Sequence, residues 1–222
     1  MNQSPPKVTI QVVTHNSAKD LAPLLASLRD FTSAAYHIRF IDNNSSDDSV
    51  ALIKKALPNA AVISLPQNTG YSGGHNIGFA ACTTPFVLVL NPDTTLHKQG
   101  VAEILSAMES QPEIGAIQGL ILREEEVIVD SAGIKRTITL NGVDVGSGNA
   151  HTNQYRKQVQ IDGVTGACGL MRMKALKEVA YGSYKITEHD ALEVFDKDFF
   201  AYKEDVDLGW RLQKHNWSIV FL

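Results

Sequence analysis

One carboxylate in this sequence follows directly on a buried strand. The apolar run Phe86–Leu90 ends at Asn91-Pro92, and Asp93 comes next. Pro92 cannot donate to a β-ladder and favours an extended residue before it, so the strand should end there, with Asp93 just past its carboxyl end. In open α/β sheets, ligands bind at that edge. The alternative is that Asp93 only caps a turn or a helix.

A pair of carboxylates opens the last amphipathic segment. Glu204 and Asp205 follow three aromatic residues, Phe199, Phe200 and Tyr202. Aromatic surroundings lower the local dielectric, which tunes a carboxylate for proton transfer. Acids in the first turn of a helix also complement the helix dipole, so a purely structural role stays open.

Polar side chains also follow two earlier apolar runs. Asp42 and Asn43 come after the run 37–41, and Thr14 and Asn16 end the run before it. Asp42 offers a carboxylate that can accept a hydrogen bond from the imide N–H of a pyrimidine. Each of these residues could equally form an Asx turn or a helix cap.

Two further patterns have ready structural explanations. A cluster of four glycines lies between residues 70 and 78. Glycines could let backbone N–H groups approach a phosphate, but the spacing of this cluster fits neither a dinucleotide fingerprint nor a P-loop. A tight turn with close helix packing explains the glycines as well. The cluster comprises Gly70, Gly73, Gly74 and Gly78. Asp207 and Arg211 stand four residues apart, which suits an ion pair along one helix face.

Strands and helices in regular alternation should position these residues. Apolar runs predict strands, at 8–13, 37–41, 62–65, 86–90 and 219–222. Apolar stripes predict helices between them, the first through Leu21, Leu24, Leu25 and Leu28. Ser17 and Asp20 are spaced like a capping box at its start. This alternation predicts an α/β fold with a doubly wound, mostly parallel sheet flanked by helices.

The alternation stops after residue 122. Asn141-Gly142 between short apolar runs is a hairpin signal, so we expect a small antiparallel insertion. The triplet 124–126, all glutamate, should form a solvated turn, and residues 182–190 should be a flexible segment.

Composition excludes several classes of protein. The 222 residues are 44% hydrophobic and 20% charged, with a formal net charge of -4, so no basic surplus suggests nucleic acid. Cys82 and Cys168 are far apart and lack metal-ligand spacing, so we expect neither a disulfide framework nor structural zinc. No apolar run approaches the ~20 residues of a membrane span. We expect a cytoplasmic protein, with peripheral contact at the inner face of a membrane left open.

Together the motifs resemble family 2 glycosyltransferases, and most of all their rhamnosyltransferase-like branch. The resemblance runs from about Val8 to the end of the chain. Its motifs are 13–16, 41–45 with Asp47, 68–70, 76–78, 91–93, 166–168, 204–207 and 210–211. It implies a single GT-A catalytic domain over 1–222, a dTDP-, UDP- or GDP-sugar, a glycan or lipid-linked acceptor, Mg²⁺ or Mn²⁺, and inversion at the anomeric carbon.

The resemblance also implies a role for each motif. Nucleotide-sugar binding would fall to Thr14, Asn16, Asp42, Asn43, Gly70, Asn76 and Asn91. The cleft for sugar and acceptor would be lined by Gly166, Ala167, Cys168 and Arg211. Asp93 would bind the metal ion, Asp205 would deprotonate the acceptor hydroxyl, and Glu204 would support that base.

The sequence departs from the family pattern in two places. Asn91 takes the first position of the usual Asp-x-Asp motif, which leaves Asp93 as its only anionic ligand. Similar enzymes often carry a histidine beyond the strand that begins here at Ile219, so we expect a longer native chain that transfers sugar better than these 222 residues. Two rival functions stay open. They are a sugar-nucleotide pyrophosphorylase, which would want a glycine-rich basic loop in place of 14–16, and a non-catalytic nucleotide-sugar-binding module.

Overall fold

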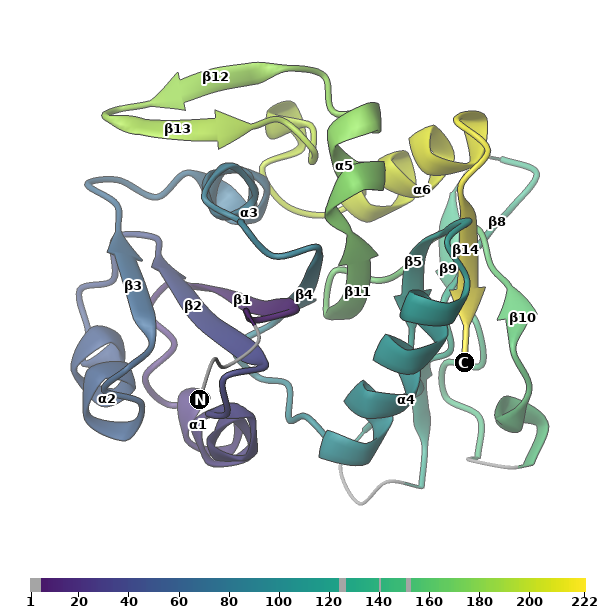
Figure 1. Cartoon of the computed structure of the whole chain (residues 1–222), viewed down its shortest axis with the longest axis horizontal. Coiled ribbons are helices and arrows are strands. Elements are labelled where there is room, and N and C mark those ends of the chain that lie inside the picture. Colours follow the sequence, from purple (N-terminus) through teal and green to yellow (C-terminus); the bar gives the residue numbers. More distant parts are fainter. Residues whose placement is uncertain (1–4, 124–126, 140, 151–152) are drawn as a thin grey trace.

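The computed structural model describes residues 5–123, 127–139, 141–150 and 153–222, and its centre is an eight-stranded sheet (Figure 1). The strand order is β10-β14-β5-β11-β4-β1-β2-β3. Four parallel strands form one half of it, namely β1 (Val8–Thr14), β2 (Tyr36–Asp42), β3 (Ala61–Ser64) and β4 (Phe86–Leu90). The predicted strands of this half are confirmed to within one residue at either end.

The other half of the sheet is mixed. Strand β11 (Cys168–Arg172) lies antiparallel between β4 and β5 (Ile114–Gln118). Strand β14 (Ser218–Phe221) runs parallel to β5. Strand β10 (Val159–Gln160) is the edge strand and pairs antiparallel with β14. The carboxyl ends of β1 to β5 and of β14 therefore meet the amino end of β11 at one edge of the sheet.

Helices cover both faces of the sheet, as the apolar stripes predict. On one face lie α1 (Leu21–Leu28), the 3₁₀ turn Arg29–Phe31, α2 (Ser49–Ala56) and α4 (Lys98–Ser110). On the other lie α3 (Gly70–Ala80), α5 (Met173–Val179) and α6 (Glu204–Lys214). This layering confirms the predicted α/β fold.

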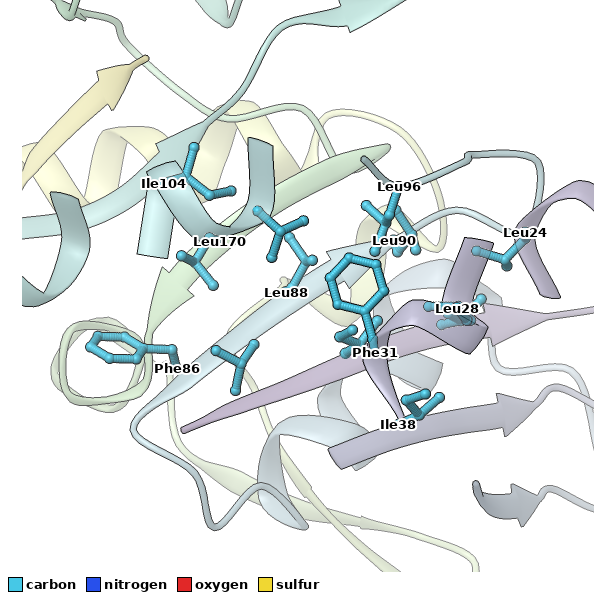
Figure 2. Close-up of a cluster of buried hydrophobic side chains, with 14 of the residues drawn as sticks. Leu24, Leu28, Phe31, Ile38, Phe86, Leu88, Leu90, Leu96, Ile104 and Leu170 are labelled. Atoms are coloured by element: carbon cyan, nitrogen blue, oxygen red, sulfur yellow. The ribbon is translucent and has the colours of Figure 1, made fainter. Parts of the chain in front are cut away.

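Strand β4 is buried on both faces because side chains alternate along a strand. Leu88 and Leu90 join the cluster beneath α1 and α4, whereas Val87 and Val89 join the cluster beneath α3, α5 and α6. Figure 2 shows the first cluster, where Leu28 of α1 and Ile104 of α4 accompany Leu88. An uninterrupted apolar run is what burial on two faces requires.

The helix start predicted at Ser17 is wrong in its detail. The Ser17 carbonyl accepts from the backbone N–H groups of Asp20 and Leu21, but its hydroxyl bonds to the carbonyl of His15, so no capping box forms. The four leucines of α1 are all buried as predicted. Burial of such a stripe, at about 1.5–3 kcal/mol for each leucine, is enough to hold the helix without a side-chain cap.

The predicted antiparallel insertion is present. Strands β6 (Ile121–Leu122) and β7 (Val129–Ser131) form one pair, and β8 (Ile134–Arg136) and β9 (Gly142–Asp144) form another. A short 3₁₀ segment, Asn153–Arg156, follows. The turn predicted for the three glutamates lies outside the described residues.

The segment expected to be flexible is instead a hairpin. Strands β12 (Ser183–Ile186) and β13 (His189–Leu192) pair antiparallel and pack on α3, where Ala191 joins a small apolar cluster with Ile77. A 3₁₀ turn, Lys197–Phe199, then leads into α6. None of the helices in the described ranges has the length and apolar character needed to cross a bilayer.

Candidate active site

The ends of β1 and β2 place Thr14 and Asp42 side by side in register. Both are buried, with Asp42 only 4% exposed. The Thr14 hydroxyl has no hydrogen-bond partner among the described residues. One oxygen of Asp42 accepts a long bond, 3.3 Å, from the backbone N–H of Ser45. A buried hydroxyl and a buried carboxylate with spare acceptor capacity can bind a polar ligand at this edge.

Asn16 connects the two loops that follow these strands. It adopts a left-handed backbone, with φ of 51°, which asparagine tolerates better than most residues. Its N–H donates to the hydroxyl of Ser45 at 3.0 Å, and its side-chain oxygen accepts from the N–H of Ser46 at 2.8 Å. Asn16 thus holds the shape of the two loops, and its side chain is exposed.

Asn43 has a structural role, because its side-chain amide is bonded at both atoms. The nitrogen donates to the Gly70 carbonyl and the oxygen accepts from the backbone N–H of Thr69, each at 2.8 Å. The residue is 2% exposed. Asn43 therefore fixes the start of α3 against the end of β2, and its predicted part in nucleotide-sugar binding stays a prediction.

The glycines serve close packing, which was the structural alternative for them. A Cβ at Gly74 would stand 2.9 Å from Val13, and one at Gly78 would stand 2.2 Å from Gln11, so α3 can approach β1 only with glycine there. The N–H of Gly70 donates to the side chain of Asn68 at 2.9 Å. Gly70, at φ 73°, is a turn residue whose N–H is already satisfied, so the predicted contact of that N–H with a phosphate does not fit.

Asn76 is also engaged inside the protein. It is fully buried, its oxygen accepts from the N–H groups of Val194 and Phe195, and its nitrogen donates to the Phe195 carbonyl and to the Tyr184 hydroxyl. All the capacity of the amide nitrogen and both lone pairs of the oxygen are used. The predicted nucleotide-sugar contact is therefore replaced by a structural bond between α3 and the segment before α6.

The end of β4 carries Asn91 and Asp93. The N–H of Asn91 donates to the Ala167 carbonyl at 3.0 Å, so the turn is fixed against the segment that leads into β11. The Asp93 side chain is exposed, and no hydrogen bond or ion pair engages it within the described ranges. Asp93 is thus free to bind a ligand at the strand edge.

The acid pair lies at the start of α6, against residues 166–168. One oxygen of Asp205 accepts from the N–H of Gly166 at 3.3 Å, and the other accepts from the N–H of Val206 at 2.8 Å. Burial raises the pKa of Asp205. Glu204 is 4% exposed, and its Oε2 atom has no partner among the described residues. Burial, reinforced by the charge of Asp205, raises the pKa of Glu204 to about 7.

The backbone before this pair is strained. Phe200, Tyr202 and Lys203 all have positive φ values, of 59°, 71° and 75°. Each such non-glycine residue costs on the order of 1–3 kcal/mol, and such strain tends to gather at functional sites. Here it turns the chain into α6, with Phe200 and Tyr202 left exposed beside the acids.

Tyr71 and Cys168 complete the surroundings of the acids. Tyr71 donates from its hydroxyl to the Gly166 carbonyl at 2.6 Å. Cys168 opens β11 opposite Leu90, and burial raises the pKa of its thiol to about 12, so it stays protonated and is no nucleophile. Sequence reasoning missed Tyr71, because its partner is 95 residues away and no local pattern indicates the contact.

Arg211 bonds to groups inside the protein, and its predicted place in the cleft stays a prediction. Its guanidinium forms two bonds with the Asp207 carboxylate and one each with the carbonyls of Val179 and Val194. The ring of Tyr181 lies 4.5 Å from its central carbon. The i,i+4 pair, which was the structural alternative, is what the structure contains, and it connects α6 to α5 and to the segment after β13.

A cavity of about 630 Å³ lies away from these residues. It is lined by Pro85 before β4 and by Arg172 at the end of β11, which places it at the opposite edge of the sheet. Arg172 is engaged by the carbonyls of Met108, Gln111 and Ile114. The edge with the strand ends and the acid pair therefore remains the candidate active site.

A mostly parallel sheet flanked by helices, with carboxylates at the carboxyl ends of its strands, is the architecture of GT-A glycosyltransferases. The family model described as "Glycosyl transferase family 2" matches residues 9–180. This chain belongs to glycosyl transferase family 2 and is a glycosyltransferase, as the motifs predicted. The matched segment ends before α6, so it does not include the acid pair.

Curated relatives agree with the rhamnosyltransferase-like branch. The chain is 26% identical over 235 residues to an N-acetylglucosaminyl-diphospho-decaprenol L-rhamnosyltransferase of Mycobacterium tuberculosis, covering 96% of this chain and 72% of that protein. It is 22% identical over 216 residues to the low-salt glycan biosynthesis hexosyltransferase Agl10 of Haloferax volcanii, covering 96% of this chain and 63% of that protein.

Solved structures confirm the GT-A fold. GalNAc-T7, solved with UDP, GalNAc and Mn²⁺, superposes with a TM-score of 0.72 at 12% identity, covering 100% of this chain and 43% of that one. The mannosyltransferase PcManGT of Pyrobaculum calidifontis, solved with GDP-Man and Mn²⁺, gives 0.66 at 13% identity, covering 99% and 55%. The chain thus spans about half the length of these neighbours.

Proposed function

We propose that this chain transfers a sugar from a nucleotide sugar to a hydroxyl of a glycan or lipid-linked acceptor, with inversion at the anomeric carbon and Asp205 as general base. The observation that carries the proposal is the acid pair at the start of α6, in which Glu204 is buried and Asp205 is bonded through Gly166 to the edge where the strands end. Two relatives, a rhamnosyltransferase and a hexosyltransferase, support the class of reaction.

Asp205 suits the role of base in position and in proton affinity. Two backbone N–H groups, from Gly166 and Val206, orient its carboxylate, which leaves a lone pair on each oxygen. Burial raises its pKa, which makes it a stronger base than a solvated aspartate. It would take the proton of the acceptor hydroxyl as that oxygen attacks the anomeric carbon. The nucleoside diphosphate would leave from the opposite side, which inverts the centre.

Glu204 would assist by sharing protons with its neighbour. With a pKa of about 7 it is close to half-protonated at neutral pH, and its unbonded Oε2 can accept from or donate to an acceptor hydroxyl. A protonated Glu204 also spares Asp205 a second negative charge nearby, so Asp205 can stay ionised.

The other side of the site would bind the nucleotide. The buried carboxylate of Asp42 can accept from a pyrimidine imide, and the unsatisfied Thr14 hydroxyl can bond to the base or the ribose. Asn91 offers a side chain at the end of β4, between this pair and the Gly166 segment. We propose a dTDP-, UDP- or GDP-sugar as the substrate.

The residues at the β4 end fit a divalent metal held jointly with the substrate. In the part of the chain that the structure describes, no cluster of three or more acids, histidines or cysteines could enclose a metal ion. Mg²⁺ is usually bound by one or two carboxylates together with substrate phosphates and water, and Mn²⁺ suits the same oxygen ligands. Asp93, exposed and unengaged, would hold Mg²⁺ or Mn²⁺, which neutralises charge on the departing diphosphate when bound.

A lipid-linked acceptor would place the protein at the cytoplasmic face of a membrane. This part of the proposal rests on the mycobacterial relative, whose name gives a decaprenol-linked acceptor, and on the exposed aromatic side chains Phe200 and Tyr202, which precede the acids in the chain. Aromatic rings of this kind suit the membrane interface as well as the apolar face of a sugar.

The proposal is tested by measuring nucleoside diphosphate release from dTDP-, UDP- and GDP-sugars, with and without Mn²⁺ and acceptor glycans. Thermal unfolding of the same samples reports binding alone, since ligand at a hundredfold its dissociation constant adds ~2.7 kcal/mol of stability. Binding of a nucleotide sugar without release or transfer would favour the non-catalytic module instead. Asp93→Ala should weaken nucleotide-sugar binding only in the samples with Mn²⁺. Asp30→Ala, at an exposed aspartate in the 3₁₀ turn after α1, should leave binding unchanged.

A further inference from the structure

Tyr71 is the second residue of α3 and lies in the aromatic cluster under the hairpin β12–β13. Its ring centre is 4.3 Å from that of His75 and 5.8 Å from that of Phe195. Its hydroxyl leaves this cluster and donates to the Gly166 carbonyl at 2.6 Å, at the short end of the range for such bonds. Packing thus holds the ring, while the hydroxyl bonds to Gly166, the residue whose N–H donates to Asp205.

Gly166 is the residue through which this contact reaches Asp205. Its carbonyl accepts from Tyr71 and its N–H donates to the Asp205 carboxylate at 3.3 Å. A Cβ at Gly166 would stand 2.8 Å from the Tyr71 hydroxyl, so the close approach requires glycine. The N–H and the carbonyl of Gly166 belong to different peptide planes, which are joined only through the φ and ψ of this glycine. Because glycine has an unusually wide choice of both angles, a hydrogen bond to its carbonyl narrows the range of directions that its N–H can take.

The neighbouring residues hold the segment but do not replace this bond. The N–H of Thr165 donates to the side chain of Gln118 at 2.7 Å, and the carbonyl of Ala167 accepts from the N–H of Asn91 at 3.0 Å. These contacts fix the chain on either side of Gly166. The orientation of Gly166 itself depends on Tyr71 and Asp205.

We propose that Tyr71 is a positioning residue for the reaction: it holds the Gly166 backbone so that the Gly166 N–H orients and stabilises the ionised form of Asp205. The inference rests on the proposed function, because it assigns Tyr71 to the base of that reaction. Tyr71 touches neither the acceptor nor the reacting atoms and acts through Gly166.

The charges around Tyr71 keep it a hydrogen-bond donor. Burial, and then the nearby Glu204, Asp205 and Cys168, raise the pKa of Tyr71 well above its ordinary value. The titratable groups around Asp205 and Tyr71 are Glu204 on α6, Cys168 on β11 and Asp144 on β9. Of these, Glu204 titrates near neutral pH, so Asp205 must be observed separately from it.

The test replaces Tyr71 by phenylalanine, which keeps the ring and removes the hydroxyl. A looser Gly166 N–H stabilises the Asp205 carboxylate less, so the pKa of Asp205 should rise. The acidic limb of the kcat profile should therefore move to higher pH. We expect kcat to fall by roughly 3- to 10-fold, the loss of about one hydrogen bond, with KM for the nucleotide sugar unchanged.

The matched control is Tyr184→Phe. That hydroxyl also bonds to α3, through Asn76, but it has no contact with Gly166. The control should leave the pH profile in place even if it lowers the melting temperature. Tyr71→Phe with the parent's pH profile, whatever its rate, would overturn the proposal and leave Tyr71 a packing residue.

A measurement that needs no turnover separates this inference from the proposed function. Carboxyl ¹³C chemical shifts, with the Asp205 resonance assigned through Asp205→Asn, report its titration directly. A raised Asp205 pKa in Tyr71→Phe supports the positioning role, and an unchanged one overturns it. Full transfer activity in Asp205→Asn would instead refute the proposed function, and the titration would still decide whether Tyr71 acts on Asp205.

Discussion

The two sides of the candidate active site are built by different means. On the nucleotide side, Thr14, Asp42 and Asp93 stand at or just past the ends of three adjacent parallel strands, β1, β2 and β4. On the acid side, Asp205 is oriented by Gly166, 39 residues earlier, and Gly166 by Tyr71, a further 95 residues earlier. Regular strands place the first set, and contacts between distant segments place the second.

Backbone conformation differs in the same way. On the nucleotide side the left-handed residues Asn16 and Asn44 are asparagines, which adopt that conformation at low cost. On the acid side the left-handed residues are Phe200, Tyr202 and Lys203. The acid side therefore carries strain that the rest of the fold must offset, which is typical of the part of a site that performs the chemistry.

The largest effect should come from Asp205→Asn. The change keeps the shape of the side chain and removes the base, so kcat should fall by about 10²–10⁴-fold while nucleotide affinity stays near the parent's. Steady-state rates and calorimetric titration with nucleoside diphosphate measure the two quantities. Asp198→Asn, an exposed aspartate on the same approach to α6, is the control. Parent-like transfer by Asp205→Asn would reduce Asp205 to a helix-capping residue.

Arg211→Met should destabilise the fold on the acid side while leaving the chemistry of the folded protein unchanged. The change leaves the Asp207 carboxylate and the carbonyls of Val179 and Val194 without their partner, which we expect to cost about 2–4 kcal/mol. Denaturant unfolding measures the loss of stability in this variant. The control is Arg29→Met, at an exposed position after α1, on the face of the sheet opposite α6.

The outcome of that comparison also decides where Arg211 belongs. Below the unfolding temperature, KM for the acceptor should match the parent's. A stable variant with a raised acceptor KM would return Arg211 to the cleft, where the sequence had placed it.

The sequence predicts the strand ends on the nucleotide side well because its signals there are local. Apolar runs followed by polar residues mark where β1, β2 and β4 end, and a strand end is where a carboxylate meets the ligand edge. It predicts the acid side less well. Whether Asn76 or Arg211 faces a ligand or a backbone carbonyl depends on which distant segment folds over it, and side-chain type alone does not say.

The hairpin β12–β13 shows the same limit within the fold. Its turn places Thr187 at φ 55°, a conformation that β-branched residues rarely adopt. The usual Asn-Gly or Asp-Gly turn signal is absent there, although it is present at Asn141-Gly142, where the hairpin was predicted. The packing of Ala191 against α3, which no turn pattern indicates, stabilises the hairpin instead.

Glu204→Gln should change how stability depends on pH. Burial raises the pKa of Glu204 from 4.5 to about 7, so between these values the folded protein binds more protons than the unfolded chain. Stability therefore falls as the pH rises through this window, and the loss is complete above about pH 7. Glutamine stays neutral, so the variant should be more stable than the parent by about 1–3 kcal/mol near pH 8 and similar near pH 4.

Urea unfolding at both pH values measures this effect. Glu103→Gln, at an exposed position on α4, should show no such pH dependence. A parent and a Glu204→Gln variant whose stabilities change in parallel with pH would mean that Glu204 is not held in its neutral form by burial.

Asp42→Ala should change ligand binding alone, and it sharpens what the nucleotide side recognises. Removing the carboxylate leaves the imide of a bound pyrimidine without an acceptor, so affinity for UDP or dTDP should fall by about 1–3 kcal/mol, whereas affinity for ADP, which has no imide, should hardly change. Asp48→Ala is the control, since that exposed side chain caps nothing at the start of α2. If the parent already binds UDP, dTDP and ADP equally, Asp42 serves only the turn that it forms with Ser45, and base selection must come from elsewhere on this edge. If discrimination is present in the parent and absent in the variant, a buried carboxylate at a strand end is sufficient to select the base, with no contribution from the distant contacts that build the acid side.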